Sequence, residues 1–395
     1  MLALAAEFLF ERSHTSNQRA EANKEQIRRE NAIPKLCAVL RMPCWESRYQ
    51  ACSALSELAF RNEKNCLAIV RAPGALDSLV ELIQVDTGGT MQEDAALVIN
   101  NCAAFSEMAC PAIVACPGLV DALKHLAIGG SFGAKNVAVG AINCLSRCRA
   151  AKEGLIASRV VEEALKPVLR EPGSGDKHEA RQARAAMAMA NLTGDVDDAG
   201  QEGLDNHQSA IATTVKILGF ALDGRSWAGI HFAPYSVVYP LTNLAANPKN
   251  REQLVECGLL ELLARFVNDW KRVGHHADET LSLAIELASH LKGAWEWQQR
   301  MREGGVVSAL KKVRDRRRRE TVECSKRAEE LLDELMQGHL AVLMSQHPRL
   351  GTNSSLHCLD EYATGIILDY AFGGRLCALD DVCADDVSLQ HLDNV

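Results

Sequence analysis

Residues Ala51 to Ile83 read ACSALSELAFRNEKNCLAIVRAPGALDSLVELI, and this stretch decides the fold. Its pattern predicts a helix, a turn that bears asparagine, a short second helix, a corner marked by glycine and a third helix. One such unit is too small to bury its own apolar faces, so it becomes stable only when stacked on copies of itself. The sequence contains such copies, and we expect an all-α solenoid of about six to seven three-helix repeats.

The corner recurs roughly every 42–49 residues, near the length of about 40–47 residues that is typical of helical solenoid repeats. Glycine suits a corner because a residue with positive φ lets two helices meet at a sharp angle without a Cβ clash. Asparagine can adopt this left-handed conformation, whereas a β-branched valine cannot do so cheaply. The corner positions are Asn31, Gly74, Gly118, Val160, Ser209, Gly258 and Gly305.

The longest helix of each unit precedes the corner and carries a polar side chain at one register position. In stacked repeats one helix of each unit lines the inner wall, so this register predicts a polar stripe along a groove. Amide side chains there can bond the backbone of an extended segment whatever its sequence. The predicted groove residues are Glu57, Asn101, Asn143, Asn191, Asn243 and Glu286, with Tyr239 one turn before Asn243. Arg147, Arg149, Arg181 and Arg184 lie on or near the same helices and would favour an acidic partner.

Composition limits the function classes. The 395 residues carry a net charge of −8, which does not favour general binding to nucleic acid or to a membrane surface. The 14 cysteines stand singly inside apolar helical patterns, which indicates a reduced compartment. The start of the chain lacks a basic region, so we do not interpret it as a signal peptide, and no stretch is long enough to span a membrane. We expect the cytoplasm, with the nucleus as an alternative.

Three glycine- and aspartate-rich inserts interrupt the spacing and are expected to be surface loops: Arg170–Glu179, Thr193–Gln208 and Asp223–His231. Residues Ala309 to Met336 form one strongly charged helical pattern that predicts a capping helix pair at the end of the solenoid. We therefore divide the chain into a solenoid, residues 1–335 with clear repeats over about 20–315, and an acidic, irregular tail, residues 336–395.

The units resemble armadillo repeats. The resemblance rests on ALSELAFRNEKNCLAIVRAPGALDSLVELI and PLTNLAANPKNREQLVECGLLELLARFV, which share a small-residue helix, an asparagine turn and a glycine corner. It implies a right-handed superhelix with an extended concave groove that holds extended peptides or partner domains, as in adaptors and scaffolds. Nuclear-import receptors of this family pair the groove asparagine with a tryptophan one turn earlier. Here that position reads Ser53, Leu97, Val139, Met187, Tyr239 and Ser282, so only Tyr239 with Asn243 approaches the arrangement.

Motifs for chemistry are weak. Gly129–Asn136 lacks the spacing of a phosphate loop and predicts a helix–helix turn. Cys144 and Cys148 lie one turn apart without further ligands, which is typical of buried small residues, and the adjacent His275 and His276 point to different helix faces. No nucleophile elbow, zinc-protease pair or kinase signature is present. We therefore predict a protein that is not an enzyme and that binds neither cofactor nor metal.

The C-terminal third holds two further candidates. A basic patch runs from Lys311 to Arg319, comprising Lys311, Lys312, Arg314, Arg316, Arg317, Arg318 and Arg319. It reads either as the solvated face of a capping helix or as a nuclear-localisation or nucleic-acid patch, and the acidic tail could fold back on it. Trp295 and Trp297 offer one indole for the core and one as an exposed anchor for a partner.

The combined prediction is a protein-binding scaffold or adaptor that holds an extended peptide or a partner protein in the groove. Two alternatives remain open. The first is a substrate-recognition partner in ubiquitin ligation or chaperone cycling, with the catalytic module on another chain. The second is a nuclear-transport or nucleic-acid-associated factor that uses the basic 311–319 patch. The expected partners are other proteins rather than nucleic acid, membrane insertion is not expected, and the sequence leaves the oligomeric state open.

Overall fold

The structure is a computed structural model that describes residues 2–14, 19–85, 90–193, 208–227, 229–270, 277–292, 295–315 and 322–346. It divides into two compact units, Met1–His290 and Leu291–Val395. The described residues are almost entirely helical, and their only β-type feature is one isolated bridge between Trp227 and Ile230. The predicted all-α class is therefore confirmed.

The first unit repeats one sequence of elements: a long helix, a short helix and a helix that follows a corner. The long helices are α1 (Leu2–Ser13), α4 (Trp45–Ala59), α7 (Thr90–Phe105), α10 (Phe132–Ser146), α13 (Asp176–Thr193), α15 (Pro234–Ala246) and α18 (Ala277–Leu291). The short helices are α2 (Ala20–Arg29), α5 (Glu63–Arg71), α8 (Cys110–Ala115) after the 3-10 turn η1 (Glu107–Ala109), α11 (Arg149–Ala157) and α16 (Pro248–Glu256). After the corners come α3 (Ala32–Val39), α6 (Ala75–Gln84), α9 (Leu119–Gly129), the π turn η2 (Val161–Leu165) with α12 (Lys166–Arg170), α14 (Gln208–Leu222) and α17 (Leu259–Asp269).

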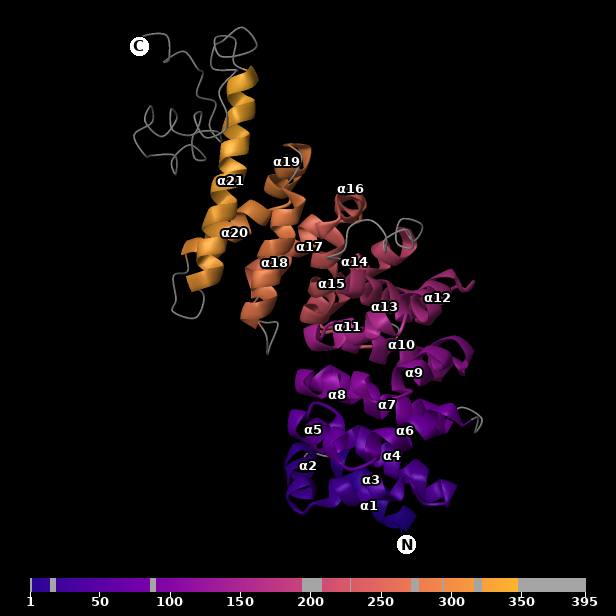
Figure 1. The fold of residues 1–395 in the computed structure, drawn as a ribbon. Helices are drawn as coiled ribbons and strands as arrows, with labels where there is room; N and C mark the ends of the chain where they lie inside the picture. Colours follow the sequence, from indigo (N-terminus) through magenta and orange to yellow (C-terminus); the bar gives the residue numbers. More distant parts are fainter. Residues whose placement is uncertain are drawn as a thin grey trace, which may run out of the picture. The chain divides into compact units, whose positions relative to one another are not determined.

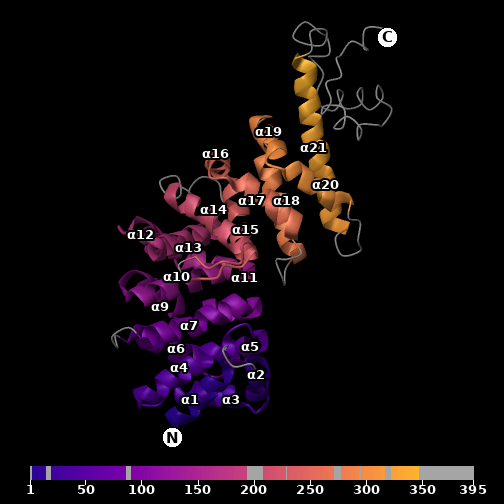
Figure 2. The ribbon, with the colours of Figure 1, turned by 180° about the vertical axis from the view of Figure 1, so that it is seen from behind.

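The long helices stack on one another in chain order, because each of α4, α7, α10, α13 and α15 contacts the one before it (Figures 1 and 2). Small side chains make this close stacking possible. The run from Ala185 to Thr193 on α13 is buried throughout, since it faces helices on several sides. Alanine-rich long helices thus form the centre of the core, and leucine and isoleucine from the flanking helices cover it.

The corners follow the predicted chemistry at most positions. Asn31 takes the left-handed conformation with φ 56°, and Gly74, Gly118, Gly258 and Gly305 have φ between 66° and 84°. The prediction of a corner at Val160 is wrong. Val160 has a right-handed conformation with φ −58°, and the preceding Arg159 takes φ 56° instead. A valine in the left-handed region would force its branched Cβ against the backbone, so the turn lies one residue earlier.

The Ser209 corner is also wrong, because α14 already begins at Gln208 and Ser209 is helical. Two inserts are shorter than predicted. The first is a loop only over 171–175, since α12 ends at Arg170 and α13 begins at Asp176. In the second, Thr193 ends α13, Gln208 begins α14, and residues 194–207 lie outside the described residues. The third insert, Asp223–His231, is non-helical and folds around the Trp227–Ile230 bridge.

The second unit contains α19 (Trp295–Glu303), α20 (Val306–Asp315) and α21 (Val322–Gln346). Helices α20 and α21 pack on one another, and their role as a cap of the solenoid stays a prediction. Helix α21 continues to Gln346, so the boundary predicted at 335/336 falls inside a helix. The side chains of Trp295 and Trp297, residues 316–321 and the tail from residue 347 lie outside the described residues.

Among the described residues no single helix is long and apolar enough to cross a membrane. One bent pair, Glu107–Ala115 with Leu119–Gly129, reaches that length and composition only when its two helices are taken together, and they meet at 92°.

Candidate binding surface on the long helices

The predicted groove residues all lie on α4, α7, α10, α13, α15 and α18, and we call the face that these helices form the long-helix wall. Successive helices of the wall are in contact from α4 to α15. Helix α18 joins the wall through Thr242 of α15, whose Oγ1 donates to the carbonyl oxygen of Leu283 at 3.3 Å. The shared register of the polar residues therefore becomes a series across neighbouring repeats.

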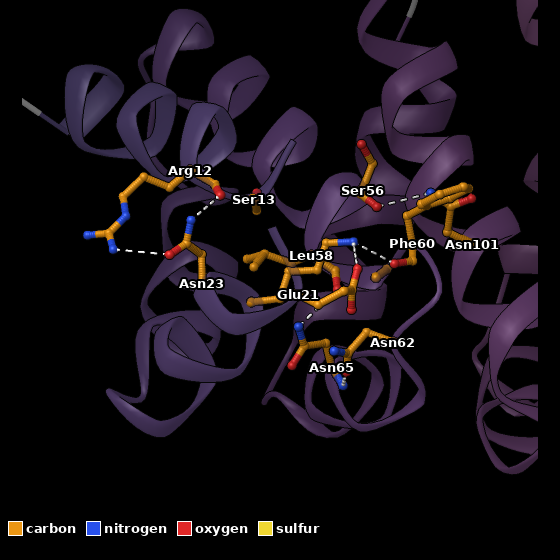
Figure 3. A network of polar contacts seen from close by, with 12 residues as sticks. Arg12, Ser13, Glu21, Asn23, Ser56, Leu58, Phe60, Asn62, Asn65 and Asn101 are labelled. Atoms are coloured by element: carbon orange, nitrogen blue, oxygen red, sulfur yellow. Dashed lines mark hydrogen bonds and ion pairs between the residues drawn. The ribbon is translucent and has the colours of Figure 1, made fainter. Parts of the chain in front are cut away.

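Three ladder asparagines bond the long helix of the preceding repeat. The Nδ2 of Asn101 donates to the carbonyl oxygen of Ser56 at 3.0 Å (Figure 3). The Nδ2 of Asn191 donates to Ser146 Oγ at 3.0 Å, and that of Asn243 donates to Asn191 Oδ1 at 3.1 Å. Asn101 and Asn191 are buried, so their amides help to hold neighbouring repeats together.

Asn143 differs from the other ladder asparagines. The residue is only 6% exposed, yet its Oδ1 has no hydrogen-bond partner, and no bond across the wall reaches its amide from the described residues. Ser146, three residues later, bonds the backbone oxygen of Asn143 at 2.8 Å and not its side chain. A buried amide oxygen without a hydrogen-bond donor is costly, so this position needs an explanation.

The remaining predicted positions lie toward the two ends of the wall. Glu57 is half-buried, and its Oε2 has no hydrogen-bond partner. Glu286 is exposed and lies 4.0 Å from His290 Nε2 on the same helix. Tyr239 is half-buried, and its ring lies 6.3 Å from that of Tyr235, one turn earlier on α15. Tyr235 was not predicted, although its spacing from Tyr239 could have revealed it.

The centre of the wall also contains Arg184 of α13. Its Nη1 donates to the backbone oxygen of Asn136 on α10 at 3.3 Å, and its guanidinium lies 5.3 Å from the Phe232 ring. The absence of a side chain at Gly140 leaves room for this approach, because a Cβ there would lie 3.3 Å from Arg184 Nη1 and 2.9 Å from Asn100 Oδ1. Burial lowers the pKa of the Arg184 guanidinium.

The four predicted arginines have different environments. Arg147, the residue after α10, is half-buried and its Nε has no hydrogen-bond partner. Arg149 is exposed. Arg181 is buried and bonds Glu171 Oε2 at 2.6 Å. Burial raises the pKa of Tyr235 while Arg147 acts against this shift, so the Arg147 charge and the Tyr235 hydroxyl influence one another. Only Arg147 and Arg184 therefore contribute to the centre of the wall.

The weak motifs take the structural roles that the sequence predicts. Gly130 and Ser131 connect α9 to α10, and Ser131 Oγ caps α10 by accepting from the backbone N–H of Ala134 at 3.2 Å. Cys148 is buried and Cys144 is half-buried. Within the described part of the chain, no three His, Cys, Asp or Glu side chains are placed to hold a metal ion. Of the basic patch, Lys311, Lys312 and Arg314 lie on α20, and Arg316 to Arg319 lie outside the described residues.

No protein-family model matches this chain, and no curated protein matches it. A crystal structure of an engineered protein matches with a TM-score of 0.54 and 21% identity, over 92% of this chain and 84% of that one. A designed armadillo repeat protein matches with a TM-score of 0.36 and 18% identity, over 76% and 99% of the two chains. Another designed armadillo repeat protein, solved in complex with the peptide (KR)4, matches with a TM-score of 0.34 and 18% identity, over 76% of this chain and 99% of that one.

The chain folds as an armadillo-type α-solenoid. The repeated order of long helix, short helix, left-handed corner and third helix carries this assignment. The armadillo resemblance predicted from the sequence is confirmed to that extent.

Proposed function

We propose that the long-helix wall of this armadillo-type solenoid binds an extended segment of another protein around α10. The observation that carries the proposal is the unpaired Asn143 amide oxygen at the centre of the wall. Its neighbours in the ladder, Asn101 and Asn191, are engaged in bonds between repeats. Asn143 has no such bond to lose, so its side chain can turn toward a ligand at little cost.

The chemistry around Asn143 suits a polypeptide backbone. An amide offers both an acceptor and donors, and it can pair with the N–H and C=O of an extended segment whatever that segment's side chains are. Asn136 adds a second unpaired amide oxygen on the same helix, about two turns before Asn143. Tyr235 and Tyr239 on α15 supply half-buried rings against which a ligand side chain can pack.

The experiment compares Asn143→Ala with Asn191→Ala, after circular dichroism shows that both variants are folded. Wild-type protein selects binders from a displayed library of random peptides about 12 residues long, and fluorescence polarisation gives Kd for the enriched sequences. We expect Asn143→Ala to weaken binding about tenfold, which corresponds to about 1.4 kcal/mol. Asn191→Ala is the matched control, because its amide is engaged inside the wall; it should lower stability more than affinity.

The proposal is wrong if the wild-type chain enriches no peptide over an empty support. It is also wrong if every selected peptide binds Asn143→Ala as tightly as it binds the wild type, since the binding surface would then lie elsewhere.

A further inference from the structure

Two guanidinium groups at the centre of the long-helix wall have no carboxylate partner among the described residues. Arg184 contacts the Asn136 backbone oxygen and the Phe232 ring, and Arg147 has an Nε that is closed to solvent and unpaired. Elsewhere in the unit, buried cations do have acidic partners: Arg181 bonds Glu171 at 2.6 Å, and Lys124 bonds Glu163 at 2.8 Å. Arg147 and Arg184 differ from these two cations, although Arg48 of α4 also has an unpaired Nε.

A guanidinium that is removed from water without a counter-charge is destabilising. Burial lowers the pKa of the Arg184 guanidinium, and the neighbouring Cys144 acts against this shift. Stacking on Phe232 offsets part of the cost, because the ring face attracts a cation. An anion brought by a ligand would remove the remaining cost of the unpaired charge. The low local polarity would strengthen its attraction to the guanidinium.

The acidic groups nearest the wall do not supply this anion. Asp94 of α7 accepts a hydrogen bond from Ser53 Oγ at 3.0 Å and so faces α4. Glu93 lies against Gly133 at the start of α10, two turns before Gly140. Glu107 and Glu279 lie near enough to Tyr235 to raise its pKa. Among the described residues, no carboxylate is paired with Arg147 or Arg184.

We propose that the segment bound on the long-helix wall is acidic, with aspartate or glutamate side chains placed against Arg147 and Arg184. This inference rests on the proposed function, because it names the chemistry of the ligand for the same wall. The net charge of −8 makes the proposal selective, since the chain as a whole repels acidic peptides and only a local site can overcome that repulsion.

The test uses three labelled peptides of equal length, each about 12 residues, that alternate serine with glutamate, glutamine or lysine. Fluorescence polarisation measures Kd for the full chain at low and near-physiological salt. We expect the glutamate peptide to bind at least tenfold more tightly than the glutamine peptide, and the lysine peptide to bind no better than glutamine. Affinity for the glutamate peptide should fall as salt rises, since salt screens exposed charges.

Variants locate the binding. Arg147→Gln and Arg184→Gln should each weaken the glutamate peptide about tenfold and leave the glutamine peptide unchanged. The control is Arg149→Gln, which removes an equal charge from an exposed residue at the start of α11. It should change neither affinity by more than about twofold. The Arg147 Nε has no hydrogen bond to lose, so Arg147→Gln keeps the test valid if Arg184→Gln unfolds the protein.

The outcomes separate the two proposals. Equal binding of the glutamate and glutamine peptides, weakened by Asn143→Ala, overturns the acidic ligand and leaves the proposed function standing. An equal loss in Arg149→Gln and Arg147→Gln shows general charge attraction and also overturns the acidic site. If none of the three peptides binds, the acidic ligand is overturned, and the library selection alone decides the proposed function.

Discussion

Asn243 donates its Nδ2–H to the Oδ1 of Asn191 across 3.1 Å, and this bond joins α15 to α13. Asn191 in turn donates to Ser146 Oγ, so three consecutive long helices are linked by side-chain hydrogen bonds. Each bond lies where neighbouring repeats meet. Because a solenoid gains its stability at these junctions, the bonds contribute to the coupling between repeats as well as to the local structure.

Asn191→Ala should lower the free energy of unfolding by about 2 kcal/mol, since it removes one bond from Ser146 and one from Asn243 in a buried setting. Asn143→Ala should change it by less than about 0.5 kcal/mol, because the Asn143 oxygen has no bond to lose. Urea unfolding followed by circular dichroism gives both values. Equal losses in the two variants would show that the ladder asparagines do not differ as the structure indicates.

The register of the ladder could be predicted from the sequence, but its bonding could not. A period of 3.6 residues identifies the helix face on which Asn101 and Asn143 lie. It does not say which amide reaches a neighbouring repeat, because that depends on helix spacing and on the residue opposite. Arg184 was predicted only as a nearby cation, since its contact with Asn136 requires the space left by Gly140.

The corners show a similar limit. The glycine corners were predictable because only glycine takes positive φ without strain. Arg159 was not, because arginine gives no signal for the left-handed region, and the sequence pattern placed the turn at Val160. Local pattern thus predicts the type of element well, and it predicts a boundary poorly where packing forces an unfavourable backbone angle.

Arg159→Gly should stabilise the protein, because it removes a Cβ from a residue with φ 56°. We expect a gain of about 0.5–1 kcal/mol, since glycine also gives up more chain entropy on folding. Gly118→Ala is the opposite substitution at a corner with φ 75°, where the nearest atom to a new Cβ would be 3.7 Å away. It should cost about 1–2 kcal/mol from backbone strain alone.

Thermal and urea unfolding of these two variants test the corner assignment. A loss of stability in Arg159→Gly would contradict the left-handed conformation of Arg159. An unchanged stability in Gly118→Ala would contradict the left-handed conformation of Gly118.

Acid should weaken the junction between α10 and α13, because it protonates the Glu171 carboxylate that links them. Its carboxylate bonds Lys135 at 2.9 Å and Arg181 at 2.6 Å. Burial acts to raise the pKa of Glu171, but the two cations outweigh it and hold the pKa below the ordinary 4.5. A carboxyl whose folded pKa is lowered stabilises the fold above its unfolded pKa, and that stability is lost as pH falls through the folded pKa.

The stability difference between wild type and Glu171→Gln should therefore be about 2 kcal/mol at pH 7 and should shrink below about pH 4.5. Urea unfolding at a series of pH values measures it. A difference that stays constant down to pH 3 would show that Glu171 does not interact with its cations as an ionised group.

Cys44 should be the most reactive of the described cysteines. It is exposed at the N-cap of α4, and hydrogen bonds from the Ser47 side chain and backbone lower the pKa of its thiol. Burial raises the pKa of Cys37 to about 12 and also raises that of Cys52. Since the thiolate is the reacting species, brief iodoacetamide treatment at pH 7.5 should label Cys44 well before either buried thiol.

Peptide mapping by mass spectrometry reads the order of labelling, and Cys44→Ser removes the first site as a control. Early modification of Cys37 or Cys52 in folded protein would contradict their burial in α3 and α4.

Gly140→Ala tests whether the centre of the long-helix wall depends on a missing side chain. In an exposed helix interior this change would stabilise the protein by up to about 1 kcal/mol, because alanine favours the helix. Here the new Cβ would lie 2.9 Å from Asn100 Oδ1 and 3.3 Å from Arg184 Nη1, so both side chains must move. We expect no net gain in stability, and a displacement of Arg184 from its place beside Asn136.

Binding of the glutamate peptide to Gly140→Ala should then weaken severalfold, while binding of the glutamine peptide is kept. Gly219→Ala on α14 is the matched control, since its Cβ would meet only Leu262 at an ordinary 3.5 Å. A clear stabilisation by Gly140→Ala with unchanged peptide binding would mean that Arg184 does not need the space that Gly140 leaves.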